Sequence, residues 1–95
     1  MTGRETFDAR DIWSAAYLLV MGVPLRRAYV NSEGRVRWEF SNEDDRAWQT
    51  SRQWRDGAEA LVNGPALAQA YRDVARASST ARRDREYRPD GDRSQ

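Results

Sequence analysis

The chain has 95 residues, a formal net charge of +1, and no cysteine or histidine. The missing residue types exclude disulfides, zinc sites built on thiolates or imidazoles, thiol nucleophiles and histidine general bases. All 16 basic residues are arginine, and the nearly balanced charge argues against a dedicated, strongly basic nucleic-acid binder. These limits predict one small cytoplasmic domain that is not an enzyme and needs no cofactor or metal.

The first predicted element is an apolar helix over residues 9–21, after a flexible N-terminus over residues 1–6. Asp8 is expected to cap the helix, with Asp11 three residues on as in a capping box. Apolar residues cover nearly all sides of this helix, which predicts that it is buried on more than one side. Its apolar run is about half of the ~20 residues that a membrane span needs, so no membrane association is expected. Gly22 is expected to end the helix in the left-handed conformation.

A β-hairpin is predicted next. Residues 35–40 alternate strictly between charged and apolar side chains, which is typical of a strand with one buried face. This alternation directs three side chains to the core: Val36, Trp38 and Phe40. Leu25–Val30 is the expected partner strand, and residues 31–34 have the composition of a hairpin loop.

Two further helices are predicted after the hairpin. Ser41 is expected to cap the first of them, with Asp44 as the capping-box partner and Gly57 as the stop. The last helix is expected to start after the Asn63 cap and to cover residues 65–79. Apolar residues at helical spacing define its core face: Leu67, Ala70, Tyr71 and Val74.

The C-terminal segment, residues 80–95, contains one tyrosine and no aliphatic side chain larger than alanine. Such a composition predicts a disordered charged tail, because the segment buries too little apolar surface to offset the entropy of folding. The sequence therefore predicts a single α+β domain over residues 7–79, in the order helix, β-hairpin, helix, helix.

Several short segments together resemble a family of short bacterial, plasmid and phage proteins described only as a domain of unknown function. They are residues 7–11, residues 15–22 with Ala-Ala-Tyr-Leu-Leu before Gly22, the strand 35–40 leading into the acids at 43 and 44, and residues 60–63 with Ala-Leu-Val-Asn. The similarity covers residues 7–77. It implies an α+β domain and a mobile-element or phage setting, and it implies no activity for any residue. Ala9 departs from the pattern, which favours a capping hydroxyl there.

Two groups of acidic residues are candidates for metal binding or acid–base chemistry. Asp8 and Asp11 are three residues apart, and residues 43–45 are consecutive acids. Both groups are expected at helix N-termini, where the helix dipole favours negative charge without any ligand. No catalytic, metal-binding or cofactor-binding residue is therefore predicted.

Arginines and exposed aromatics supply the candidate binding residues. Arginines on the outer face of the hairpin are expected to approach one another, and Tyr29 and Trp48 fit the buried stripes of their segments least well. Tryptophan, tyrosine and arginine also dominate interface hot spots. The predicted binding residues are Arg26, Arg27, Tyr29, Arg35, Arg37, Trp48 and Arg52.

Two functions follow from these residues. The favoured one is a small protein-binding module, such as an accessory factor, inhibitor or assembly subunit, because the charge is nearly balanced. The alternative is a nucleic-acid-binding accessory protein that uses the hairpin arginines and the basic residues of the tail. A homodimer is a further option, since a thin core often gains stability from self-association.

Overall fold

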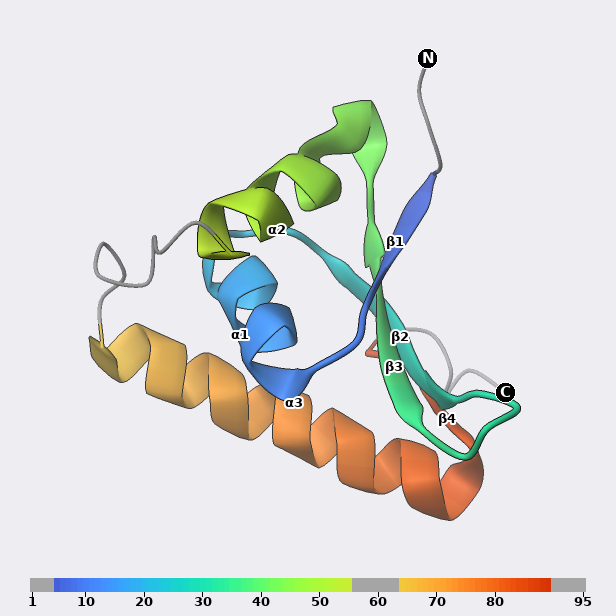
Figure 1. The fold of residues 1–95 in the computed structure, drawn as a ribbon. Coiled ribbons are helices and arrows are strands. Elements are labelled where there is room, and N and C mark those ends of the chain that lie inside the picture. The colour runs from blue at the N-terminus through green and yellow to red at the C-terminus, as the bar shows by residue number, and fades with distance from the viewer. Residues whose placement is uncertain (1–4, 56–63, 90–95) are drawn as a thin grey trace.

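Residues 5–55 and 64–89 are the part of the chain that the structure, a computed structural model, describes (Figure 1). They form a four-stranded antiparallel sheet and helices, which confirms the predicted α+β class. In chain order the elements are β1 (Thr6–Ala9), α1 (Ile12–Val20), β2 (Leu25–Val30), β3 (Val36–Ser41), the 3₁₀ turn η1 (Glu43–Asp45), α2 (Arg46–Arg55), α3 (Gly64–Asp84) and β4 (Glu86–Tyr87). The predicted stop at Gly57 and cap at Asn63 lie outside the described residues.

The strands lie in the order β1-β3-β2-β4, so β1 and β4 form the two edges of the sheet. The predicted hairpin is confirmed, because β2 and β3 pair in antiparallel register. In its loop the side chain of Asn31 accepts hydrogen bonds from the backbone N–H groups of Glu33 and Arg35, at 2.8 and 3.0 Å. Gly34 has a φ of 81°, where a residue with a Cβ is strained.

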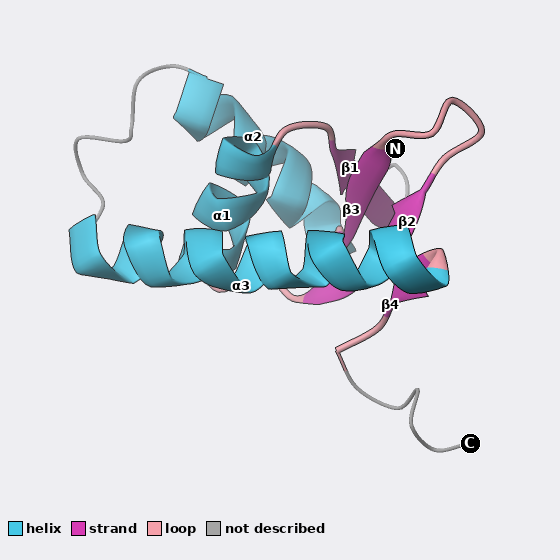
Figure 2. Ribbon diagram, turned by 90° about the horizontal axis from the view of Figure 1, so that it is seen from below, coloured by secondary structure: helices cyan, strands magenta, loops and turns pink. Residues whose placement is uncertain are grey.

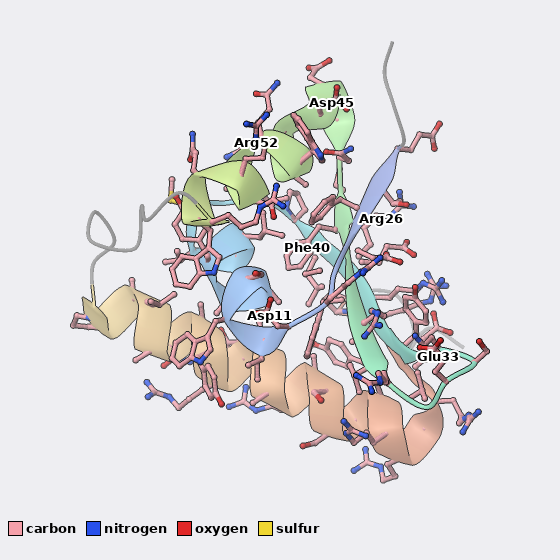
Figure 3. All side chains as sticks on the ribbon, viewed as in Figure 1. Asp11, Arg26, Glu33, Phe40, Asp45 and Arg52 are labelled. Carbon is pink, nitrogen blue, oxygen red and sulfur yellow. The ribbon has the colours of Figure 1, made fainter. Side chains whose placement is uncertain are left out.

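The helices pack on one face of the sheet and leave the other face open (Figures 1 and 2). The three apolar residues of β3, which alternate with polar ones, are buried and point to the helix-covered face, as predicted. Phe40 lies between the sheet and the helices (Figure 3). The indole N–H of Trp38 donates to the backbone carbonyl of Val74 on α3 at 3.3 Å, which ties the sheet to the longest helix.

The predicted start of the first helix at residue 9, with Asp8 as its cap, is wrong, because Thr6–Ala9 form strand β1. Phe7 pairs with Phe40, and Ala9 is buried opposite Trp38. Thr6, predicted to belong to a flexible terminus, is the first residue of the strand.

Helix α1 therefore begins at Ile12, with Asp11 as its cap in place of Asp8. The Asp11 carboxylate accepts from the backbone N–H of Ser14 at 2.9 Å. The predicted end at Gly22 is confirmed, with a φ of 87°. Two 3.0 Å bonds close this end as a Schellman motif, from Gly22 N–H to the Leu19 carbonyl and from Val23 N–H to the Leu18 carbonyl.

The predicted capping box at Ser41 is also wrong. Ser41 is the last residue of β3 and donates its backbone N–H to the carbonyl of Pro24 at 2.9 Å, so it stays in the sheet. The next residue, Asn42, accepts from the backbone N–H of Trp48 in the first turn of α2 at 3.1 Å. Asp44, the expected box partner, lies in η1 with a φ of 56°, a left-handed conformation that aspartate tolerates better than most residues.

The expected disordered tail is wrong for its first part. Helix α3 continues to Asp84, five residues beyond the predicted end, and β4 then pairs with β2. Ala81, in the extension, is buried although its side chain is small, as is Ala77 one turn before it. Tyr87 on β4 packs against the core. Residues 90–95 lie outside the described part of the chain.

Trp13 lies on the first helix, which is expected to be buried on more than one side, yet this residue is only half buried. Its side chain is 46% exposed and packs against the ring of Tyr71 on α3, with ring centroids 4.4 Å apart.

Within the described residues, none of the helices combines the length and the apolar character that a bilayer crossing requires.

Candidate binding site

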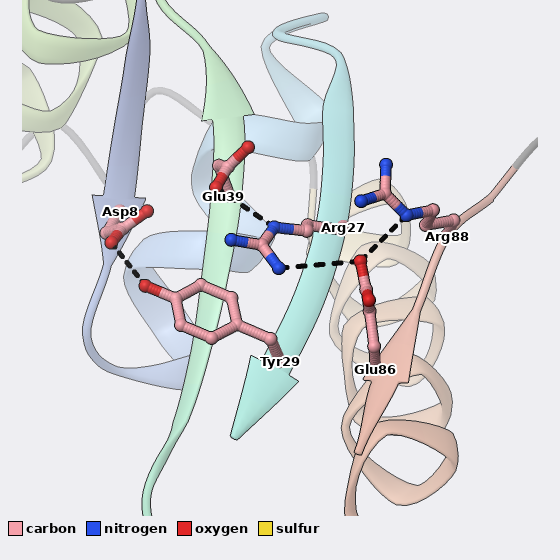
Figure 4. Close-up of polar contacts among 6 residues, drawn as sticks. All are labelled: Asp8, Arg27, Tyr29, Glu39, Glu86 and Arg88. Atoms are coloured by element: carbon pink, nitrogen blue, oxygen red, sulfur yellow. Dashed lines mark hydrogen bonds and ion pairs between the residues drawn. The ribbon is translucent and has the colours of Figure 1, made fainter. Parts of the chain in front are cut away.

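The open face of the sheet carries a network of polar side chains from all its strands (Figure 4). Asp8 on β1 accepts from the Tyr29 hydroxyl on β2 at 2.6 Å, across the intervening strand β3. Arg27 contacts Glu39 at 3.1 Å and Glu86 on β4 at 3.4 Å. The period of two along each strand brings these groups together, because the alternate residues of the same strands face the core.

Arg27 is therefore not a free basic group. Burial disfavours its charge, but the hydrogen bond and negative charge of Glu39, together with those of Glu86, outweigh burial and raise the pKa of Arg27 above its usual value. Arg88 makes a further ion pair with Glu86 at 2.7 Å. Two acids thus meet two arginines at this end of the face, and little net charge remains.

Tyr29 is held between a cation and an anion. The guanidinium of Arg27 lies 4.2 Å from the centroid of the Tyr29 ring, within cation–π distance. Partial burial and the hydrogen bond to the Asp8 carboxylate raise the pKa of Tyr29 to about 12. The hydroxyl is thus protonated at neutral pH and donates to Asp8.

The other predicted arginines of the hairpin differ in position. Arg37 lies on the open face opposite Tyr29 and donates to the carbonyl of Val36 at 3.2 Å. Arg26 is exposed at the register shift between Leu25 and Arg27, and Arg35 is exposed at the end of the hairpin loop. The hairpin surface is therefore mixed in charge, in contrast to the basic patch that the sequence suggested.

An open groove of about 1030 Å³ runs along β1. Every residue of β1 lines it, together with the hairpin loop, the start of α1 and one side of α2. Its charged lining, within the described residues, has both signs. The acids are Asp8, Asp11, Glu33 and Asp45, and the arginines are Arg10, Arg37 and Arg55.

Trp48 is the large apolar side chain on the rim of this groove. It is 45% exposed, as its poor fit to the buried stripe of the helix suggested. The guanidinium of Arg52, one turn along α2, lies 5.1 Å from the Trp48 ring centroid. Two of the predicted binding residues are thus brought together, and Trp48 shares the groove lining with Tyr29 and Arg37.

The two groups of acidic residues, Asp8 with Asp11 and residues 43–45, occupy positions in the fold that account for them without a ligand. The Asp11 carboxylate caps α1 and also accepts from the Ser14 hydroxyl at 2.9 Å, while Asp8 binds Tyr29. Residues 43–45 form η1 ahead of α2. Within the described residues, no three acidic side chains are grouped so as to hold a metal ion.

Sequence reasoning missed the acidic half of the open face. Asp8 was assigned to a helix cap, and Glu86 was placed in a disordered tail. The position of Glu39 could have been predicted from the sequence, because its strict alternation with Trp38 and Phe40 places it on the same face as Arg37. The sequence does not predict that Arg55 and Ser51 line the groove, since their proximity to β1 depends on how α2 packs.

Comparison of the chain with protein-family models, with curated proteins and with solved structures found no match.

Proposed function

We propose that this protein is a small non-enzymatic protein-binding module, and that the groove along β1 is its binding site. The observation that carries the proposal is the half-exposed Trp48, which has the Arg52 guanidinium over its ring and lines a groove that the edge strand β1 also lines. Tryptophan and arginine at such positions are the residues that most often dominate binding energy. The family resemblance adds a mobile-element or phage setting to this proposal.

The charge distribution favours a protein over a nucleic acid as the partner. A nucleic-acid site needs several free cations along a phosphate backbone, and its affinity falls steeply with salt. Here Arg27 is already paired with two carboxylates, and the groove is lined by carboxylates as well as by arginines. A polyanion in the groove would meet repulsion from Asp8 and Asp45, whereas a peptide can match both signs.

The test compares two tryptophans of equal exposure. The tagged protein and its Trp48→Ala and Trp13→Ala variants are used to capture partners from the native host, and the affinity of the captured protein is then measured. Trp48→Ala is expected to weaken binding at least about tenfold, as truncation of an interface hot spot does. Trp13→Ala is the matched control, because Trp13 is 46% and Trp48 45% exposed, and only Trp48 lines the groove.

Equal loss of affinity from both variants, or no loss from Trp48→Ala, would contradict the proposed site.

A second measurement tests whether the partner is a protein or a nucleic acid. The protein is expected to pass through a heparin column at physiological salt without retention, and strong retention that falls with added salt would favour nucleic acid instead.

A further inference from the structure

The outer edge of β1 has its own hydrogen-bonding pattern. The backbone N–H of Asn42 donates to the carbonyl of Glu5 at 2.9 Å, so residue 5 points its polar backbone groups toward β3. In antiparallel pairing the direction of the backbone N–H and C=O groups alternates from one residue to the next. The backbone groups of Phe7 and Ala9 therefore also point toward β3. Thr6 and Asp8 consequently direct their N–H and C=O groups away from the sheet. Within the described residues, no backbone hydrogen bond reaches this outer side.

The opposite edge of the sheet is protected, whereas this one is not. β4 has two residues and is followed directly by Arg88 and Pro89, and a short strand with a proline is a common way to block edge pairing. β1 has four residues and contains no proline. The sheet thus has one edge on which a further strand can add.

The groove gives this edge a second wall. All four residues of β1 line it, and so do Trp48, Ser51 and Arg55 of α2, the helix that contacts β1. Since side chains of an added strand would alternate, one set would face Phe7 and Trp48, and the other would face Asp8 and Arg37. A slot between a strand edge and a helix fits a single extended chain.

We propose that β1 binds an extended peptide segment of a partner protein by strand addition, a mode that rests on the proposed protein-binding function. Backbone groups of Thr6 and Asp8 hold the peptide, and its side chains alternate between apolar ones beside Trp48 and polar or charged ones beside Asp8 and Arg37. A second copy of this chain fits less well. Its own β1 is flanked by its own α2, so two helices would compete for the space of the groove.

The probe for the test is a displayed library of random peptides of about ten residues, close to the upper length of ordinary strands. An enriched peptide is synthesised and its affinity is measured by calorimetry. Versions methylated at one backbone nitrogen at a time are then compared. Strand addition predicts a period of two, with binding weakened at least about fivefold at every second position and little changed between them.

A variant of the protein tests the same contact from the other side. Thr6→Pro removes the outward N–H without removing a hydrogen bond of the sheet, because edge strands accept proline at such positions. It is expected to weaken the peptide at least about fivefold and to leave the melting temperature nearly unchanged. Trp13→Ala is again the control for the protein surface away from the groove.

The outcomes separate this proposal from the proposed function. Loss of binding in Trp48→Ala, without a period of two in the methylated peptides and without an effect of Thr6→Pro, would overturn strand addition and leave the groove as the binding site. Binding that ignores Trp48 as well would overturn both. Failure of the library to enrich any peptide overturns strand addition, as does a self-associating chain whose dimer is broken by Thr6→Pro.

Discussion

Tyr29 illustrates how a single residue couples two strands that do not touch. Its hydroxyl reaches over β3 to the carboxylate of Asp8 at 2.6 Å. The pKa of about 12, against an ordinary value of 10.0, means that the fold favours the neutral phenol. A raised pKa of this kind contributes stability that is fully present below about pH 10 and is lost as pH rises toward about 12.

Tyr29→Phe should therefore lower stability at neutral pH by about 1 kcal/mol or less, since the site is partly exposed. It should also flatten the fall in unfolding free energy between about pH 10 and about pH 12. Denaturant unfolding of both proteins across this range measures the difference. Identical slopes would mean that the hydroxyl of Tyr29 ionises as freely in the folded protein as in the unfolded chain.

At the scale of elements, the C-terminal part of the chain is a component of the fold. Ala81 is buried on the last turns of α3, Tyr87 packs against the core, and Glu86 pairs with Arg27. A chain that ends at Ser79 should lose about 2 kcal/mol or more of stability, chiefly from the lost burial of Tyr87 and Ala81. Thermal melting followed by circular dichroism measures this. A chain that ends at Pro89 keeps both elements and is the control, and equal melting of the two chains would contradict the role of β4.

At the scale of the whole molecule, the sheet and α3 share one core through Trp38. The side chain is 5% exposed and hydrogen-bonds the carbonyl of Val74. Trp38→Ala should cost about 3–5 kcal/mol by leaving a cavity, a large fraction of the ~5–15 kcal/mol that stabilises a typical domain. All elements should then unfold together at a much lower temperature. Trp13→Ala, which removes an indole that is 46% exposed, should have a far smaller effect. Separate transitions for helices and sheet would contradict a single core.

Strong local patterns predicted much of this fold. The alternation around Trp38 identified β3, and the loop composition identified the hairpin. Gly22 marked the end of α1, because the left-handed conformation excludes most other residues. Ala70 and Val74, at helical spacing, identified the buried face of α3. In the candidate site, the same reasoning singled out Trp48 as a side chain that fits no buried stripe.

Tertiary contacts decided the rest. β1 and β4 have four and two residues, too few to show a period, and their strand conformation depends on hydrogen bonds to β3 and β2. The extension of α3 depends on alanines that are small enough to approach the rest of the core. A prediction based on the absence of larger aliphatic side chains therefore ended this helix too early. The ion pair between Arg27 and Glu86 joins residues 59 positions apart, and the groove lies between β1 and α2. Chain order and composition determine local backbone preference, whereas pairing between distant segments is selected only when the whole core packs.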